Sequence, residues 1–487
     1  MSRAGIRPRT RTTPVADEPI CSLTLVEVAE ALRAKRFSSV EVTEVMLARL
    51  KRFGGPDQLN CIAAIDEEGA LRQARAADKA LAKGGALGPL HGVPLAHKDM
   101  YYRAGRPSGR GAKFLNDAPA QTTAAALERL DQAGAIEIGR LAMVEFALGL
   151  TGHNAVAGTP RNPWNKAHIT GGSSSGPAAA VAARLVPASL GSDTGGSIRF
   201  PAASCGIVGL KPTYGRVSRF GALPLSFSLD TVGPLARTVA DCALMYRAIA
   251  GHDPRDPASS RREVPDAMAG LEGGVRGLRV GVPKSYFYDP LQPEMAERVR
   301  ASVDIYRRAG ATIVEVPIPD IAATNPLTLL VTATEGAAAH MPWLTTRAGD
   351  YGAQTLARLV AGLLIPASAY IEALAWRKSL VRDFCAQVFA ACDVLHTPIL
   401  VTPVPTIAES DIGANPGFAR MMTTMGHCTR PFNFLGIPAI SIPCGFTKNG
   451  LPAAFQLAAR PFAEDVLLRA ARAYERETDW HRQAPAL

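Results

Sequence analysis

The segments Gly171-Gly172-Ser173-Ser174-Ser175-Gly176 and Gly191-Ser192-Asp193-Thr194-Gly195-Gly196-Ser197-Ile198-Arg199-Phe200-Pro201 carry the most information in this chain. Glycine permits positive φ and lets backbone N–H groups approach a ligand closely, and serine supplies a short hydroxyl. A turn of this composition can place a nucleophilic hydroxyl beside donors for an oxyanion. We therefore expect the two segments to form a catalytic centre.

A lysine at the end of an apolar run precedes both segments, in Gly92-Val93-Pro94-Leu95-Ala96-His97-Lys98-Asp99-Met100. Burial disfavours the ammonium form, so a buried Lys98 could be neutral and serve as the base for Ser197. Ser173 could pass the proton between them. His97 is the alternative base, but successive residues of a strand point to opposite faces, so both cannot enter one site. We favour Lys98.

The composition indicates a globular protein with a basic balance. The chain has 487 residues, of which 47% are hydrophobic, and a formal net charge of +10. Part of the excess lies in a proline- and threonine-containing start with Arg3, Arg7, Arg9 and Arg11, and we expect residues 1–20 to be a disordered tail. Because no aromatic-interleaved basic motif or helix-turn-helix pattern accompanies the charge, we expect no nucleic-acid partner.

Several other classes lack their sequence signals. No apolar stretch approaches the ~20 residues of a membrane span, and no secretory leader is evident. The eight cysteines form no CxxC pair, and the nine histidines do not cluster in a metal-binding motif. We expect a soluble cytoplasmic protein with no membrane contact, no metal and no cofactor.

Alternating strand and helix patterns predict an α/β fold. Capping boxes at Thr24/Glu27 and Ser38/Glu41 predict a helical hairpin over 25–53, which could also support a homodimer. Further predicted helices cover 67–83, 122–133 and 293–309, and predicted strands cover 61–65, 92–96, 135–138, 278–282, 312–316, 393–399 and 439–442. We interpret residues 251–277 as a loop. The expected architecture is a single large mixed β-sheet covered by helices on both faces, within one domain over 21–487.

The glycine-rich segments could also belong to an α/β-hydrolase nucleophile elbow or to a phosphate-binding loop. The pattern Gly172-Ser173-Ser174-Ser175-Gly176 also matches G-x-S-x-G, which would make Ser174 an α/β-hydrolase nucleophile. Such an elbow must follow a strand, whereas residues 162–168 are a polar turn. A phosphate-binding loop is disfavoured because neither glycine-rich segment ends in Gly-Lys-Ser/Thr.

With the stretches 206–218 (GIVGLKPTYGRVS) and 436–445 (GIPAISIPCG), these motifs resemble the amidase signature family over residues 22 to 475. The resemblance implies Ser197 as the acylated nucleophile, Lys98 as the base and Ser173 as the relaying serine, in a cis peptide with Gly172. It implies an oxyanion hole made by the N–H groups of Thr194, Gly195, Gly196 and Ser197. Ser174, Asp193 and Arg199 would brace the loop. Ser175 and Pro177 depart from the usual pattern, and neither change threatens catalysis.

The function implied is hydrolysis of a small-molecule carboxylic amide to an acid plus an amine or ammonia. Alternatives within the family are the glutaminase subunit of a tRNA-dependent amidotransferase, which releases ammonia from glutamine for a partner, and a carbamate-cleaving enzyme. The segment Cys428-Thr429-Arg430-Pro431-Phe432-Asn433 resembles free-standing amidases more than that subunit, so we favour a stand-alone enzyme.

The substrate pocket is expected to be built by variable regions of the chain. These are 101–106, 143–154 and helices between 325 and 380, with Met143 and Gly172 as substrate-binding residues. Residues 356–371 contain Arg358 as their only charge, so we expect an apolar or aromatic substrate group.

Overall fold

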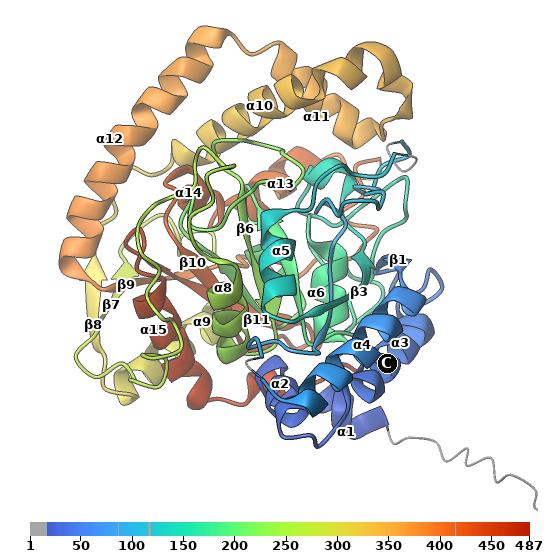
Figure 1. The fold of residues 1–487 in the computed structure, drawn as a ribbon. Coiled ribbons are helices and arrows are strands. Elements are labelled where there is room, and N and C mark those ends of the chain that lie inside the picture. Colours follow the sequence, from blue (N-terminus) through green and yellow to red (C-terminus); the bar gives the residue numbers. More distant parts are fainter. Residues whose placement is uncertain (1–16, 86, 115–117, 414) are drawn as a thin grey trace, which may run out of the picture.

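The structure is a computed structural model that describes residues 17–85, 87–114, 118–413 and 415–487 (Figure 1). The helices are α1 (Asp17–Ser22), α2 (Leu25–Arg33), α3 (Ser39–Phe53), α4 (Glu67–Lys83), α5 (Ala125–Gln132), α6 (Ser175–Ala182), α7 (Arg199–Ser204), α8 (Val239–Ile249), α9 (Pro293–Arg308), α10 (Thr324–Arg347), α11 (Ala353–Leu363), α12 (Ala367–Ala391), α13 (Phe418–Gly426), α14 (Arg430–Phe434) and α15 (Glu464–Arg476). The strands are β1 (Ile62–Ile65), β2 (Pro94–Lys98), β3 (Ile136–Leu141), β4 (Ala188–Asp193), β5 (Val208–Lys211), β6 (Thr231–Ala236), β7 (Arg279–Pro283), β8 (Thr312–Val316), β9 (Val394–Pro398), β10 (Ala439–Phe446) and β11 (Pro452–Ala459).

An eight-stranded mixed sheet forms the centre of the molecule, in the order β4-β6-β5-β10-β11-β9-β7-β8. The pairs from β4 to β9 are antiparallel, and β9, β7 and β8 are parallel. Helices α8, α9 and α15 pack against this sheet, with α15 in contact with both α8 and α9, and α6 and α7 form a second neighbouring pair on it. The predicted α/β class and the large mixed sheet flanked by helices are confirmed.

The prediction of one single sheet needs a correction, because β1, β3 and β2 form a separate three-stranded sheet. Strand β2 lies beside β4, but side chains rather than backbone groups bridge the two strands. The N–H of Leu190 donates to His97 Nδ1 at 3.1 Å, and the Tyr101 hydroxyl donates to Gly191 O at 2.6 Å. The His97 ring thus takes the Leu190 N–H, which a neighbouring strand could otherwise use.

Local sequence signals account for most of the first hundred residues. Both predicted capping boxes are present at the starts of α2 and α3, where the Thr24 and Ser38 hydroxyls accept from Glu27 N and Glu41 N. Helix α4 has the predicted bounds, and the Asp66 side chain caps its start. The predicted βαβ unit is confirmed as β7, α9 and β8, whose strands are parallel.

The predicted tail falls mainly outside the described residues. Residues 17–20 are described and belong to helix α1, and Ile20 packs in the main apolar core. Burial of this side chain ties the end of the predicted tail to the domain. The predicted loop at 251–277 contains no helix or strand.

Helices α10, α11 and α12 run around the outside of the sheet region, along the top and left edge of Figure 1. Helix α10 packs against α11 and α14. Helix α12 contacts the large sheet at β7, β8 and β9. In the described part of the chain no single helix is long and apolar enough to cross a membrane; α11 and α12 meet the length and composition criteria only as a pair bent by 91°.

Candidate active site

Lys98 ends strand β2 and points into the interior, where its side chain is 1% exposed. Its Nζ donates to Ser173 Oγ at 2.7 Å and to Ser192 Oγ at 2.9 Å. Burial lowers the pKa of Lys98 to about 7, although the carboxylates of Asp230 and Asp193 act in the opposite direction. A neutral amine, which can accept a proton, is therefore accessible near neutral pH.

Ser173 and Ser197 occupy the two glycine-rich segments. Ser173 is fully buried just before helix α6, and its peptide bond with Gly172 is cis. Ser197 lies in the turn between β4 and α7 and is 5% exposed. Ser174 N donates to Ser197 O at 3.2 Å, so the two segments are in contact. The structure thus joins Lys98 to Ser173 directly, whereas among the described residues no side-chain hydrogen bond links Ser173 to Ser197.

The backbone around Ser197 offers fewer free donors than the sequence predicted. Gly196 N donates to Asp193 Oδ1 at 2.8 Å, so this amide is taken by the carboxylate rather than turned to an oxyanion. The amides of Thr194, Gly195 and Ser197 make no hydrogen bond within the described part of the chain. The Thr194 hydroxyl donates to Asp230 Oδ1 at 2.5 Å. Of the four predicted oxyanion donors, the Gly196 amide is therefore occupied by Asp193, and the role of the other three stays a prediction.

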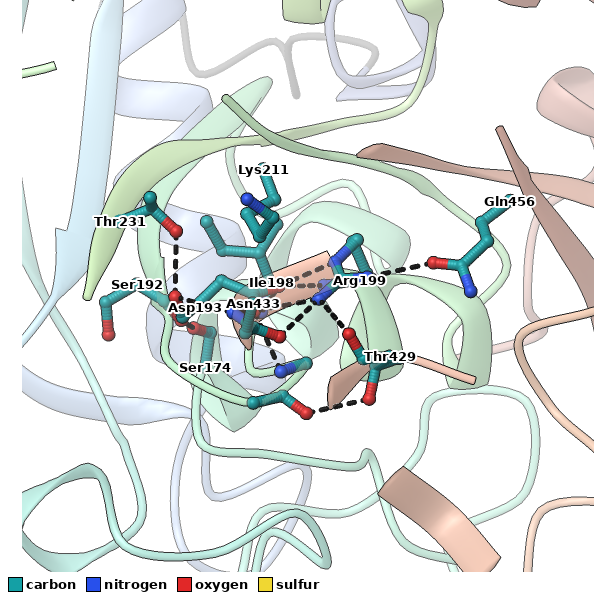
Figure 2. Close-up of polar contacts among 12 residues, drawn as sticks. Ser174, Ser192, Asp193, Ile198, Arg199, Lys211, Thr231, Thr429, Asn433 and Gln456 are labelled. Atoms are coloured by element: carbon teal, nitrogen blue, oxygen red, sulfur yellow. Dashed lines mark hydrogen bonds and ion pairs between the residues drawn. The ribbon is translucent and has the colours of Figure 1, made fainter. Parts of the chain in front are cut away.

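Asp193 and Arg199, on either side of the turn that carries Ser197, form a fully buried ion pair (Figure 2). Arg199 Nε donates to Asp193 Oδ2 at 3.0 Å and Nη2 donates to Oδ1 at 3.1 Å, in the two-pronged geometry of a strong Arg–carboxylate pair. Asp193 also accepts from Ile198 N at 3.2 Å. Burial alone would raise the pKa of Asp193, but Arg199, Lys211 and Asn433 more than offset it and hold that pKa well below its usual range.

Residues from the C-terminal part of the chain complete this network (Figure 2). Arg199 donates to Thr429 O, Asn433 Oδ1 and Gln456 Oε1 at 3.0, 2.7 and 2.9 Å. The Thr429 hydroxyl donates to Gly195 O at 2.7 Å. Asp193 and Arg199 thus connect the turn that carries Ser197 to the C-terminal part of the chain, and their bracing role stays a prediction.

Ser174, also expected to brace the loop, is buried at the start of α6, and its hydroxyl donates to Ser192 O at 3.4 Å. In the described structure no strand directly precedes residues 171–176, which disfavours the hydrolase elbow. His97 turns to Leu190 N, and burial together with Arg103 lowers its pKa to about 3. As expected for successive residues of a strand, the His97 and Lys98 side chains point to different partners, Leu190 N and Ser173 Oγ.

A cavity of about 490 Å³ opens at Ser197. Its walls come from residues 147–150, from Thr194 and Gly195, and from parts of α10, α11, α13 and α14. Two of the three expected pocket regions, 143–154 and the helices between 325 and 380, therefore contribute. Residues 101–106 do not line it.

Met143 and Gly172, predicted to bind substrate, do not line this cavity either. The Met143 side chain belongs to the apolar core, and its carbonyl accepts from Asn154 Nδ2 at 2.8 Å. Gly172 is closed in: a Cβ placed on it would lie 2.8 Å from Val144 Cγ2 and 2.9 Å from Gly149 O.

Sequence reasoning missed several contributors. Ser192 belongs to the segment 191–201 quoted at the start and accepts a hydrogen bond from Lys98 Nζ. Its position in that segment, next to Asp193, was the signal that could have identified it. Thr429, Asn433 and Gln456 lie too far along the chain for any local pattern to connect them with Arg199. Among the described residues no group of three or more His, Cys, Asp or Glu is placed to hold a metal ion.

Comparison with known proteins identifies a match to the amidase family over residues 41–468. The A-type subunit of glutamyl-tRNA(Gln) amidotransferase from Chloroflexus aggregans is 40% identical, covering 96% of this chain and 98% of the relative. A solved chain from a vestigial protein complex, described as revealing the origins of an s-triazine catabolic enzyme, is 34% identical with a TM-score of 0.87, covering 93% of this chain and 98% of that chain. Native peptide amidase from Stenotrophomonas maltophilia is 31% identical with a TM-score of 0.82, covering 96% and 99%.

These findings correct one prediction. We expected no nucleic-acid partner beside the small-molecule substrate, and this was wrong: a relative that matches over nearly its whole length is, by name, one subunit of an amidotransferase for glutamyl-tRNA(Gln). A basic motif indicates a chain that binds nucleic acid by itself. It does not detect one subunit of an assembly, which is what the name of this relative describes.

Proposed function

Since the chain belongs to the amidase signature family and is an enzyme acting on carbon–nitrogen bonds, we propose that it hydrolyses a carboxylic amide through an acyl-enzyme on Ser197. The observation that carries the proposal is the 2.7 Å hydrogen bond from Lys98 to Ser173, buried beside the segment that bears Ser197. A serine hydroxyl needs such a base to become a nucleophile at neutral pH.

In the proposed reaction, neutral Lys98 takes a proton through Ser173 while Ser197 Oγ attacks the amide carbonyl carbon. The N–H groups of Thr194, Gly195 and Ser197 donate to the oxyanion that develops. The relay then returns the proton to the amide nitrogen, the C–N bond breaks, and the amine or ammonia leaves an ester on Ser197. Water, deprotonated through the same relay, attacks that ester and releases the acid.

The relay requires Ser173 and Ser197 hydroxyls to come within hydrogen-bond reach. Catalytic hydrogen bonds are often long in free enzymes and shorten when the reacting group is bound. The backbones of the two segments are already joined, because Ser174 N donates to Ser197 O at 3.2 Å.

For the amide itself, the relatives favour the subunit role over the stand-alone role. A 40% identical amidotransferase subunit supports glutamine as the ammonia donor, used together with partner subunits and a charged tRNA. We propose this as the first function to test. It would make the cavity at Ser197 a glutaminase site.

A stand-alone amidase is the second candidate, favoured by one specific observation. Arg430, within the segment that resembles free-standing amidases, lines the cavity together with Arg358. The likeness to peptide amidase supports this candidate as well.

The deciding experiment measures ammonia and amine release from glutamine, primary alkyl amides, aryl amides and carbamates, with the Ser197→Ala variant as the blank. Release from simple amides by the chain alone supports the stand-alone enzyme. Weak release from glutamine only, increased by amidotransferase partner subunits, supports the subunit role. Equal release by the variant and the parent protein would refute Ser197 as the nucleophile.

A further inference from the structure

The cavity at Ser197 carries positive charge and no negative charge. Among its described lining residues, the charged side chains are Arg358 and Arg430, and the rest are apolar, small or neutral polar. No described carboxylate forms an ion pair with either arginine. A site that recognises an apolar substrate alone would not need two guanidinium groups in its wall.

Arg430 is held in place as a rigid part of the wall. It is 3% exposed, and its Nη1 and Nη2 donate to Asn325 Oδ1 at 2.7 Å and to Met422 O at 2.8 Å. A Cβ placed on Gly195 would lie 3.6 Å from Arg430 Cγ, so the side chain runs directly along the nucleophile loop. A guanidinium has five N–H groups, and these two hydrogen bonds leave others free for a ligand.

Gly426 makes room for this arrangement. A Cβ on Gly426 would lie 2.2 Å from Arg430 Cζ and 2.5 Å from Nε, so any larger residue there would displace the guanidinium. Helix α13 ends at this glycine, and the guanidinium fills the space beside it. The backbone is therefore shaped to accept the arginine in one position.

Arg358 approaches the same space from helix α11. Its Nη1 donates to Leu148 O at 3.0 Å and would lie 3.7 Å from a Cβ on Gly149. Burial lowers the pKa of Arg358 and of Arg430 to about 10, and the charge of Arg358 contributes to the lowering at Arg430. The neighbouring Gln354 Nε2 is buried without a hydrogen-bond partner. The cavity wall thus contains two guanidinium groups that repel each other, Arg358 and Arg430, and the Gln354 amide, whose N–H groups have no partner.

A carboxylate would satisfy all three groups, because it accepts from guanidinium and amide N–H groups and neutralises a buried cation. An ammonium would do the reverse, because it would add a third positive charge with no described carboxylate in the wall to receive it. Resting on the proposed amide hydrolysis in its stand-alone form, and against the glutaminase form of it, we propose that the acyl part of the substrate carries a carboxylate held by Arg358 and Arg430, and carries no ammonium group beside it. Monoamides of dicarboxylic acids have this chemistry, and glutamine does not.

Binding to the Ser197→Ala protein tests this without turnover. Glutaramate, pentanamide and glutamine share a five-carbon chain and differ in the carboxylate and the ammonium; succinamate, butanamide and asparagine form the four-carbon set. By titration calorimetry we expect the acid amide of at least one set to bind tenfold or more tightly than both of its partners, about the gain of a charge-assisted contact.

Substitutions in the same Ser197→Ala background locate the effect. Arg430→Met and Arg358→Met should each reduce the ratio of acid-amide to neutral-amide affinity toward one. Gly426→Ala should do the same while keeping the charge, because it displaces the guanidinium. Arg420→Met removes an equal charge from the exposed side of α13 and should retain the ratio. Circular dichroism verifies that each variant is folded.

Equal affinity for the acid and neutral amides, no detectable binding of either acid amide, or tighter binding of glutamine or asparagine would each overturn the inference. The parent protein separates this result from the proposed function. Ser197-dependent hydrolysis without a preference for acid amides would refute the carboxylate site alone. A binding preference with no amide hydrolysis, alone or with amidotransferase partner subunits, would refute the proposed function and leave the site.

Discussion

Lys98 and Ser173 are 75 residues apart in the sequence, yet Nζ and Oγ lie 2.7 Å from each other in the interior. The lysine comes from the last position of a strand in the small sheet, and the serine from the segment that leads into α6. Because the ammonium form loses its hydration there, the pKa of Lys98 falls to about 7.

This pKa predicts the pH dependence of the reaction. Below about pH 7 Lys98 is protonated and cannot accept a proton, so kcat/KM should rise tenfold per pH unit and level off above pH 7. Lys98→Ala should lose this inflection and about 10²–10⁴-fold in rate. Stopped assays of amide hydrolysis from pH 5 to 9 provide the measurement.

A second buried lysine supplies the control. Burial and Arg199 also lower the pKa of Lys211 to about 7. Its Nζ donates to Pro212 O at 3.0 Å, away from the two serines. If the inflection disappears in Lys211→Met and survives in Lys98→Ala, the base has been assigned to the wrong lysine.

Ser197 should be the residue that becomes acylated. A fluorophosphonate probe should label the parent protein and Ser174→Ala but not Ser197→Ala, as read by mass spectrometry of the labelled peptide. Ser174 is a matched control because it is buried in the adjoining segment and its hydroxyl faces Ser192 O. Label on residue 174 would restore the elbow-type nucleophile.

The Asp193–Arg199 pair should be costly to break from one side. Arg199→Met leaves an unpaired carboxylate in a fully buried position and should reduce the free energy of unfolding by about 3–5 kcal/mol. Guanidinium denaturation followed by circular dichroism measures the loss. Arg382→Met, which removes an exposed partner of Asp383, should change stability little. If both variants lost a similar amount of unfolding free energy, the buried Asp193–Arg199 pair would contribute no more to stability than an exposed pair.

Thr429 should position the nucleophile loop without touching substrate. Thr429→Val removes the hydroxyl that donates to Gly195 O and should lower kcat by about tenfold or more while changing KM less. Thr429→Ser retains the donor and should recover most of the rate. The control is Thr424→Val on α13, whose hydroxyl donates to Arg420 O. A pure KM effect would place Thr429 in substrate binding instead.

Local patterns predicted elements whose stability is local. Helix α4 was predicted at its observed bounds, because a capping aspartate and a long amphipathic run define it. Strands β4 and β6 were missed, because glycine, serine, aspartate and proline interrupt their apolar character, although both strands are completely buried. Tertiary burial overrode the intrinsic preference of these residues.

The site was predictable only as far as its motifs extend. Lys98, Ser173 and Ser197 stand in recognisable segments, whereas the competition of Asp193 for the Gly196 amide depends on side-chain geometry. The positive wall was also hidden. Arg358 on α11 and Arg430 on α14 line one cavity only in the folded chain, so the apolar run around Arg358 suggested an apolar substrate.

The brace beneath the nucleophile loop reaches far along the chain, since Arg199 bonds to residues that follow it by 230, 234 and 257 positions. During synthesis a ribosome-bound chain therefore contains Lys98, Ser173 and Ser197 long before it contains Thr429, Asn433 and Gln456. Until those residues emerge, the turn that carries Ser197 lacks the contacts that fix it. The network around Arg199 is therefore complete only when β11, the last described strand, has been translated. A product terminated before β11 would contain Lys98, Ser173 and Ser197 without the full set of contacts that hold the turn.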